Sequence, residues 1–313
     1  LWFKTAFPNH PYGASSKGGI ASVKAITADD LRAFLAKALA KDRLTIGVVG
    51  DISAADLGPL LDKTFGALPA STAFTPLPEA TLKGAGVLKV VEKAIPQSRV
   101  IFGGPGLKRD DPDWYAGYVL NYVLGGGGFA SRLYEEVREK RGLAYSVYSY
   151  LYPLDHAAIL MGGVGTKNES VVETLAVIKE QIARLRDQGL TAGELANAKT
   201  FLNGSFPLRL TSSGRIARLL LAIQRENLGI DYLDRRADLI NAVTLEDIDR
   251  VAKRLLRPEK LLIVVVGKPV GLSSSEQRHG AAFGGREALL ACGDGEPLKT
   301  RHRWLLSPLG RIG

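Results

Sequence analysis

Two side chains with complementary hydrogen-bonding chemistry, Arg138 and Tyr145, stand close together near the middle of the chain. A guanidinium carries a fixed positive charge and several N–H donors, and a phenol adds a hydroxyl donor. Together such groups supply positive charge and several donors for hydrogen bonds to oxygen acceptors. The residues alone leave a second interpretation open, because Arg138 also fits an ordinary cation near a helix C-terminus and Tyr145 an ordinary strand residue.

The residues that flank this pair predict the elements that position it. Ser131 is suited to cap a charged helix, and Gly142 is suited to end it. We therefore expect Arg138 in the last helical turn and Tyr145 at the start of the following strand.

Four consecutive glycines, Gly125, Gly126, Gly127 and Gly128, precede that helix. A Walker phosphate loop requires Lys after its last glycine, and a dinucleotide-binding turn requires a preceding strand. Here no Lys follows the glycines and a helix precedes them, so neither nucleotide-binding pattern fits. We interpret the run as a tight turn between helices, where glycine permits positive φ and close backbone approach.

The chain carries no recognisable metal motif. No two of its histidines (His10, His156, His279 and His302) are four residues apart, as a zinc-binding helix requires. The single cysteine, Cys292, excludes an internal disulfide and a Cys-x-x-Cys metal knuckle. We therefore expect no bound metal and no zinc-based catalytic residue in this chain.

The composition indicates a globular protein. The chain has 313 residues, of which 46% are hydrophobic, enough for one large or two ordinary domains. The net charge is +9, but the basic residues form neither a dense run nor a stripe with interleaved aromatics, which argues against nucleic-acid binding. No apolar run approaches the ~20 residues that cross a bilayer.

Two segments of the sequence, Thr27–Gly50 and Thr244–Gly267, resemble each other without a gap. Each begins with a Thr N-cap and acidic residues, continues as a helix with one apolar face and ends in a β-branched strand. The constant offset of 217 residues indicates two homologous domains. The second copy can be traced back to about Gly86, whereas an equally long first copy begins roughly 130 residues before Leu1. The first domain is therefore expected to be incomplete.

These observations predict four regions: the C-terminal part of a first domain at 1–70, a linker rich in Pro, Ala, Ser and Thr at 71–84, a second domain at 85–272, and a disordered or unrelated tail at 273–313. In the second domain, strands are predicted at 87–92, 99–103, 143–152, 157–165 and 261–267. Helices are predicted at 113–124, 169–187, 191–206, 213–228, 233–242 and 244–255. Strands paired early and helices grouped later predict an α+β sandwich with one sheet covered on one side.

Residues 125–149 resemble the second-domain signature of the pitrilysin/insulinase (M16) family of metallopeptidases, which runs from a Gly-rich turn through Ser-Arg-Leu and a charged helix to Arg-x6-Tyr. Further segments similar to the family are Phe7–Tyr12, 189–209, 231–244 and 264–269, so the resemblance covers about residues 1–272. It implies duplicated two-layer α/β sandwich domains of the LuxS/metallopeptidase-like type, the first one incomplete.

In that family, zinc is held by His-x-x-Glu-His and a downstream Glu, and an Arg and a Tyr face it from another domain. The resemblance therefore implies that Arg138 and Tyr145 bind substrate and the tetrahedral oxyanion, with zinc supplied by a partner subunit or by a missing N-terminal part. Zinc-bearing members commonly have Gly-Thr-x-Glu-Ser-Ile where this chain has Gly18–Val23, and Ala21 takes the place of that Glu. This departure favours a bacterial two-domain, zinc-less subunit that pairs with a zinc-bearing M16 subunit, as a heterodimer, or with a second copy.

Two alternatives stay open. In the first, the chain is a fragment of an active zinc metalloendopeptidase whose His-x-x-Glu-His lies before Leu1. In the second, it is a structural assembly subunit with a peptidase-like fold. A peptide substrate is expected, whereas nucleic acid and a membrane span are not, and the resemblance alone favours a periplasmic over a cytoplasmic location.

We predict that the purified chain neither binds stoichiometric zinc nor cleaves peptides by itself, because it lacks His-x-x-Glu-His. Elemental analysis after buffer exchange is expected to find far less than one zinc ion per chain, and fluorogenic peptides are expected to stay intact. Peptide hydrolysis that copurifies with the chain and is abolished by a chelator contradicts this prediction.

Overall fold

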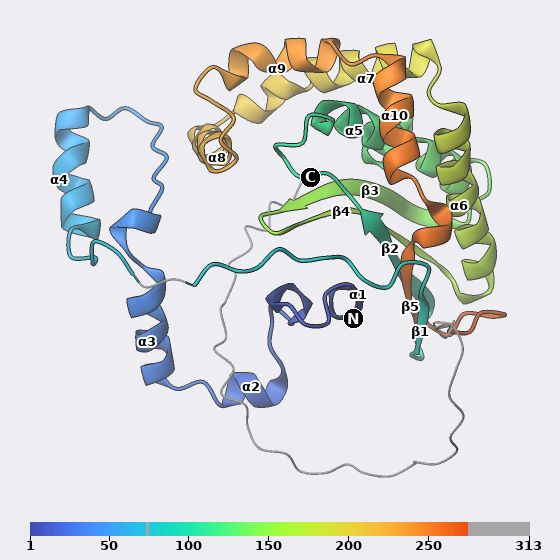
Figure 1. Cartoon of the computed structure of the whole chain (residues 1–313), viewed down its shortest axis with the longest axis horizontal. Helices are drawn as coiled ribbons and strands as arrows, with labels where there is room; N and C mark the ends of the chain where they lie inside the picture. Colours follow the sequence, from blue (N-terminus) through green and yellow to red (C-terminus); the bar gives the residue numbers. More distant parts are fainter. Residues whose placement is uncertain (73–74, 275–313) are drawn as a thin grey trace.

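The computed structural model describes residues 1–72 and 75–274, and its centre is one five-stranded sheet in the order β1-β5-β2-β4-β3 (Figure 1). The strands are β1 (Leu88–Glu92), β2 (Gln97–Pro105), β3 (Ala144–Leu154), β4 (Ala157–Lys167) and β5 (Leu262–Gly267). Strand β5 pairs in parallel with β1, and the other three pairings are antiparallel. All five predicted strands of the second copy are present, and the predicted α+β class is confirmed.

Helices from the second copy cover one face of this sheet, above it in Figure 1. They are α5 (Trp114–Asn121), α6 (Val171–Gln188), α7 (Ala192–Gly204), α8 (Ser213–Arg225), α9 (Tyr232–Asn241) and α10 (Leu245–Leu255). Ile263 and Val265 of β5 join Ile248 and Val251 of α10 in the buried core between the layers. Removal of this apolar surface from water is the main force that holds helices and sheet together.

The opposite face of the sheet carries a short helix from the start of the chain, α1 (Trp2–Ala6). Leu262 and Val264, the alternate residues of β5, pack there with Trp2 and Phe7, because successive side chains of a strand point to opposite faces. The Trp2 indole N–H donates a hydrogen bond to the Leu262 carbonyl at 2.9 Å. The sequence predicted cover on one side of the sheet, whereas the structure places cover on both.

The rest of the first copy forms α2 (Ile20–Lys24), α3 (Ala28–Ala38) and α4 (Ala54–Phe65), drawn at the left and below the sheet in Figure 1. The predicted strand at Leu44–Gly50 is wrong, because these residues form no strand and pair with none among the described residues. A strand is stabilised by hydrogen bonds to its neighbours and cannot satisfy its backbone groups alone.

The two repeated helices share their local structure and differ in burial. Thr27 caps α3 through the Asp30 N–H, and Thr244 caps α10 through the Asp247 N–H, each within a reciprocal capping box. Leu31 on α3 is nevertheless 53% exposed, whereas Ile248, the matching residue of α10, is fully buried.

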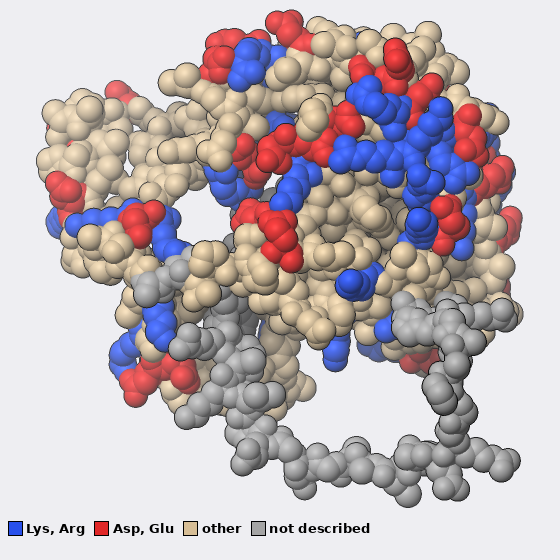
Figure 2. Space-filling view, viewed as in Figure 1, with Lys and Arg blue, Asp and Glu red and all other residues tan. Residues whose placement is uncertain are grey.

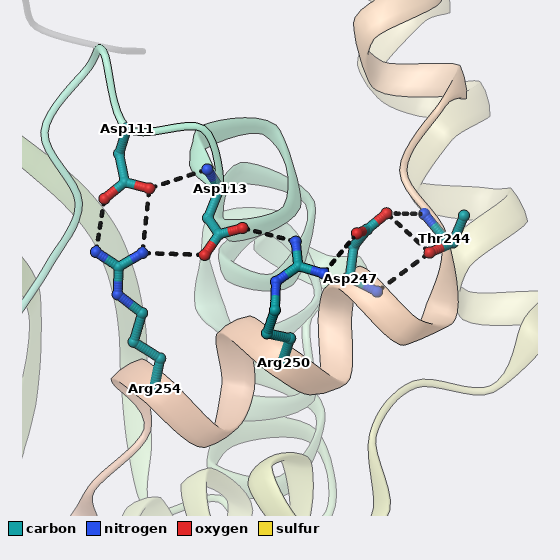
Figure 3. Close-up of polar contacts among 6 residues, drawn as sticks. All are labelled: Asp111, Asp113, Thr244, Asp247, Arg250 and Arg254. Carbon is teal, nitrogen blue, oxygen red and sulfur yellow. Dashed lines mark hydrogen bonds and ion pairs between the residues drawn. The ribbon is translucent and has the colours of Figure 1, made fainter.

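Charged side chains tie α10 to the loop before α5 (Figure 3). Arg254 forms a two-pronged ion pair with Asp111 and also contacts Asp113, and Arg250 bridges Asp113 to Asp247. Hydrogen bonds from Thr244, followed by that from Arg250, lower the pKa of Asp247 to about 2. Figure 2 shows basic and acidic side chains interspersed over this part of the surface, unlike the single-sign patch that binds nucleic acid.

The segments between these elements are short or irregular. Single 3₁₀ turns occur at η1 (Pro11–Gly13), η2 (Lys41–Arg43), η6 (Asn168–Ser170), η7 (Phe206–Leu210) and η8 (Pro258–Lys260). Within the part that the structure describes, no helix is long and apolar enough to cross a membrane. The predicted tail lies outside the described residues from 275 onward, and the predicted domain boundaries stay a prediction.

A matched pair of substitutions tests the difference between the repeats. We predict that Ile248→Ala lowers the free energy of unfolding by about 2–5 kcal/mol, since it leaves a cavity in the core. Leu31→Ala, at the repeat-related position, is expected to change it by less than about 0.5 kcal/mol because Leu31 is exposed. Denaturant titrations followed by circular dichroism measure both values, and equal losses would show that the face of α3 is covered in solution.

Candidate functional site

The glycine run forms a compact turn that brings the helical layer close to β3. Helix α5 continues into the π-helical turn η3 (Tyr122–Gly126), and η4 (Gly128–Ala130) follows. A Cβ added to Gly125 would stand 2.6 Å from the Ser149 hydroxyl oxygen, and Gly128 has φ +56°. Both reasons that the sequence suggested for glycine here, close approach and positive φ, are confirmed.

A buried polar pair lies directly behind this turn. The Ser149 hydroxyl donates to Asn121 Oδ1 at 2.8 Å, and the Asn121 amide donates to the Ser149 carbonyl at 3.3 Å. A Cβ on Gly126 would stand 2.6 Å from the same Asn121 amide nitrogen. The pair therefore satisfies polar groups that would otherwise be orphaned in the core, and it depends on the glycines beside it.

The helix that carries Arg138 begins after the turn and includes the π-helical segment η5 (Tyr134–Glu139). Ser131 does not cap it as predicted, since the Ser131 hydroxyl instead donates to the Gly128 carbonyl at 2.7 Å. The helix ends as predicted at Gly142, which has φ +60° and whose N–H bonds the Arg138 carbonyl at 2.9 Å.

An ion pair holds the start of this helix in place. Arg132 donates to both carboxylate oxygens of Glu194, at 2.7 and 2.8 Å, and to the Gly189 carbonyl at 3.0 Å. The Arg132 guanidinium, helped by hydrogen bonds from Thr191, lowers the pKa of Glu194 from 4.5 to about 2. This two-pronged contact fixes the helix against the first turn of α7, and the bond to Gly189 fixes it against the loop before α7.

The structure brings Arg138 and Tyr145 together, as the sequence predicted. The Arg138 guanidinium carbon lies 4.8 Å from the centre of the Tyr145 ring, within the range of a cation–π contact. A register shift between Ala144 and Ser146 leaves Tyr145 without a partner on β4. Such a bulge redirects a side chain away from the ladder, and Tyr145 is 81% exposed.

Two further aromatic residues, Phe129 and Tyr134, complete the site and were missed by the sequence analysis. Arg138 lies 4.7 Å from the Tyr134 ring and 5.7 Å from the Phe129 ring, and these two rings contact each other at 4.6 Å. The spacing of Tyr134 and Arg138, four residues apart on one helix, was the available signal. We call Phe129, Tyr134, Arg138 and Tyr145 the Arg138 cluster.

The Arg138 cluster can bind a polar, anionic or carbonyl-bearing ligand at the surface. Arg138 is partly exposed and its only ion pair among the described residues is a long one, 3.7 Å to Glu139. Its flat faces lie against rings, while the N–H groups at its edge suit oxygen acceptors. A guanidinium and a phenol supply positive charge and hydrogen-bond donors, so the cluster suits binding and charge stabilisation.

The two histidines within the described ranges serve other contacts. His10 Nε2 lies 3.0 Å from the Pro78 carbonyl, and His156 Nδ1 lies 3.3 Å from a Glu79 carboxylate oxygen. In those ranges no three His, Cys, Asp or Glu side chains gather as a metal site would require. His279, Cys292 and His302 lie outside the described residues.

Comparison with known proteins places this architecture in a family. A family model described as the peptidase M16 inactive domain matches residues 25–202. The chain belongs to the M16 peptidase family. A solved peptidase M16 inactive domain from Pseudomonas fluorescens is 32% identical in sequence and superposes with a TM-score of 0.78. The matched region is 88% of this M16 chain and 65% of that structure's chain.

Curated relatives carry both active and inactive names. A zinc protease of Streptomyces coelicolor, named as uncharacterized, is 31% identical over 274 residues, which are 85% of this chain and 59% of that protein. A non-peptidase homologue of Helicobacter pylori is 34% identical over 205 residues, 65% of this chain and 47% of that protein. This M16 chain thus spans less than two thirds of the length of these relatives.

The depressed pKa of Glu194 predicts a pH dependence of stability. Because the folded pKa is about 2 and the ordinary value is 4.5, the ion pair stabilises the fold fully above about pH 4.5, and its contribution declines as the pH falls towards 2. Glu194→Gln is expected to lower the unfolding free energy by about 1.5–3 kcal/mol at neutral pH. Denaturant titrations at several pH values should find this deficit shrinking between pH 4.5 and 2. A deficit that does not change with pH contradicts the assignment.

Proposed function

We propose that this chain is a non-catalytic, substrate-binding subunit of a zinc-dependent M16 peptidase. In this function Arg138 and Tyr145 bind a peptide and the oxyanion of its tetrahedral intermediate, opposite a zinc site held by a partner subunit. The observation that carries the proposal is their contact at 4.8 Å on an exposed bulge. Tyr145 is 81% exposed and lies on a β-bulge at the start of β3, so it contributes little to the core. This position leaves its side chain accessible to a ligand.

The aromatic rings of the Arg138 cluster support this role physically. Rings against a guanidinium restrict its rotamers, so less entropy is lost when a ligand binds. They also keep the cation against the Tyr145 ring, and a cation on the same residue pair as a hydroxyl donor suits a developing negative charge. Glu139 competes only weakly with a ligand for Arg138, because its side chain is 57% exposed and its carboxylate oxygen lies 3.7 Å from Arg138 Nε.

The comparisons support the coarser part of the proposal. The matching family model is described as an inactive domain, and relatives include a protein named a non-peptidase homologue. The proposal also includes a zinc-bearing partner subunit, or a second copy of this chain in its place. It further includes a peptide substrate and a periplasmic location. So do the domain boundaries, with 1–70 as the end of a first M16 domain and 85–272 as the second.

A second candidate function is a fragment of an active zinc metalloendopeptidase, favoured by relatives that are named zinc proteases and that extend beyond the matched region. The sequence encoded before Leu1 discriminates the two. A His-x-x-Glu-His there supports the fragment, and a neighbouring gene that encodes the motif supports the partner. A purely structural assembly role is the third candidate, and the exposed Arg138 cluster argues against it.

The test uses a complex reconstituted from the full-length parent of this chain and its zinc-bearing partner. Tyr145→Phe is expected to lower kcat by about 10²–10³, the usual effect of removing one oxyanion donor. The ring remains in this variant, so the contact with Arg138 and the melting temperature should persist. Arg138→Ala is expected to raise KM as well as lower kcat, since it removes charge and several donors.

Tyr148→Phe is the matched control, because Tyr148 lies on the same strand, is 43% exposed and has no ring contact with Arg138 among the described residues. It should leave kcat/KM unchanged. If Tyr145→Phe and Tyr148→Phe give the same kcat/KM as the unaltered complex, Tyr145 is an ordinary strand residue and the site assignment fails.

A further inference from the structure

A second site lies behind the glycine turn, where a cavity of about 100 Å³ opens between η3, α7, η7 and α9. Its lining includes Tyr122, Gly126, Phe201, Arg209 and Arg236. The volume is about three times the ~30 Å³ that a water molecule occupies in the liquid. The cavity therefore has room for a small organic group.

Arg236 is the unusual member of this lining, because it is a buried cation that has no paired carboxylate among the described residues. Only 6% of the residue is exposed, and its guanidinium donates to the Leu202 carbonyl at 3.2 Å and, at 3.5 Å, to the Asn203 side chain. The Phe206 ring covers one face at 4.1 Å. Within residues 1–72 and 75–274 no carboxylate forms an ion pair with it. Neutral partners offset only part of the cost of burying a charge.

Arg132, a half-buried arginine of the helical layer, pairs with the Glu194 carboxylate at 2.7 Å. Arg109 is also half-buried and has no ion pair with a described carboxylate, but it donates hydrogen bonds to the Tyr115 and Tyr232 hydroxyls. Arg236 is more deeply buried than either of them and lines a cavity.

The other residues that line the cavity indicate what kind of ligand Arg236 could bind. Arg209 is exposed, reaches the same cavity and forms no ion pair with any described carboxylate. Tyr122 and Phe201, whose ring centres are 5.2 Å apart, supply an apolar wall. Two guanidinium groups beside aromatic rings match a carboxylate that is attached to a small apolar body.

We infer that this cavity binds the carboxylate of a small apolar acid or of a peptide C-terminus, with Arg236 as the buried anchor and Arg209 as the outer contact. The inference does not rest on the proposed function of the Arg138 cluster, because none of its four residues lines the cavity. Failure of one therefore leaves the other standing.

The experiment measures the melting temperature of the full chain in acetate and propionate against chloride at equal ionic strength. Binding to the folded state alone raises the melting temperature, and we expect a rise of about 2–4 °C at saturating carboxylate. Arg209→Ala should weaken the apparent affinity at least tenfold while leaving the melting temperature in chloride unchanged, since Arg209 is exposed. Arg184→Ala, an exposed arginine of α6 outside the cavity, is the control and should behave as the unaltered chain.

Two further arms identify the ligand. N-acetyl-dialanine and its C-terminal amide distinguish the two sources of the carboxylate. If the site binds a peptide C-terminus, the acid raises the melting temperature and the amide does not. If it binds a free organic acid, acetate or propionate raises the melting temperature and the dipeptide does not. Arg236→Lys keeps the positive charge but removes the paired N–H donors of the guanidinium. An Arg236→Lys chain that still folds should show no rise in melting temperature with carboxylate. Three results would overturn the inference. They are an equal rise in melting temperature with carboxylate in the unaltered chain and all three variants, no rise in the unaltered chain, or an equal rise with inorganic phosphate.

Discussion

The approach of the glycine turn to strand β3 is the constraint on which the Arg138 cluster depends. Gly125 stands where any Cβ would strike Ser149, and Gly126 where it would strike Asn121. This contact, together with the Asn121–Ser149 pair, sets the distance between the helix that carries Arg138 and the strand that carries Tyr145. The bulge at Tyr145 then turns a residue of the same strand outward. A rigid junction of this kind can hold two binding groups in register without a metal.

The two copies of the repeated segment show how far local sequence carries a fold. Their capping boxes form alike, because a cap needs only residues within one helical turn. Their strands do not, because β5 lies between β1 and β2 while residues 44–50 have no neighbouring strand in the described structure. Burial follows the same division, with Ile248 enclosed and Leu31 exposed. Similar sequences thus reach different environments, because within the described residues only α10 packs on a sheet.

Strand β5 links the two apolar layers of the molecule. Ile263 and Val265 face the helices, whereas Leu262 and Val264 face α1. A strand buried on both faces reads as a continuous apolar run, and the β-branched run in this part of the sequence does so. The contact with Trp2 means that the beginning of the chain, which the repeat predicts to belong to a first domain, contributes to the core around this sheet.

The sequence by itself determined the features that depend on neighbouring residues. These include the order of strands and helices from residue 85 onward, the glycine turn, the helix end at Gly142 and the choice of Arg138 and Tyr145 as candidates. Only the tertiary structure decided which distant groups meet: the Phe129 and Tyr134 rings around Arg138, α1 on the second face of the sheet, and the unpaired segment of the first copy. The physical reason is that turns, caps and amphipathic periods are local, whereas pairing, burial and ring contacts depend on residues far apart in the chain.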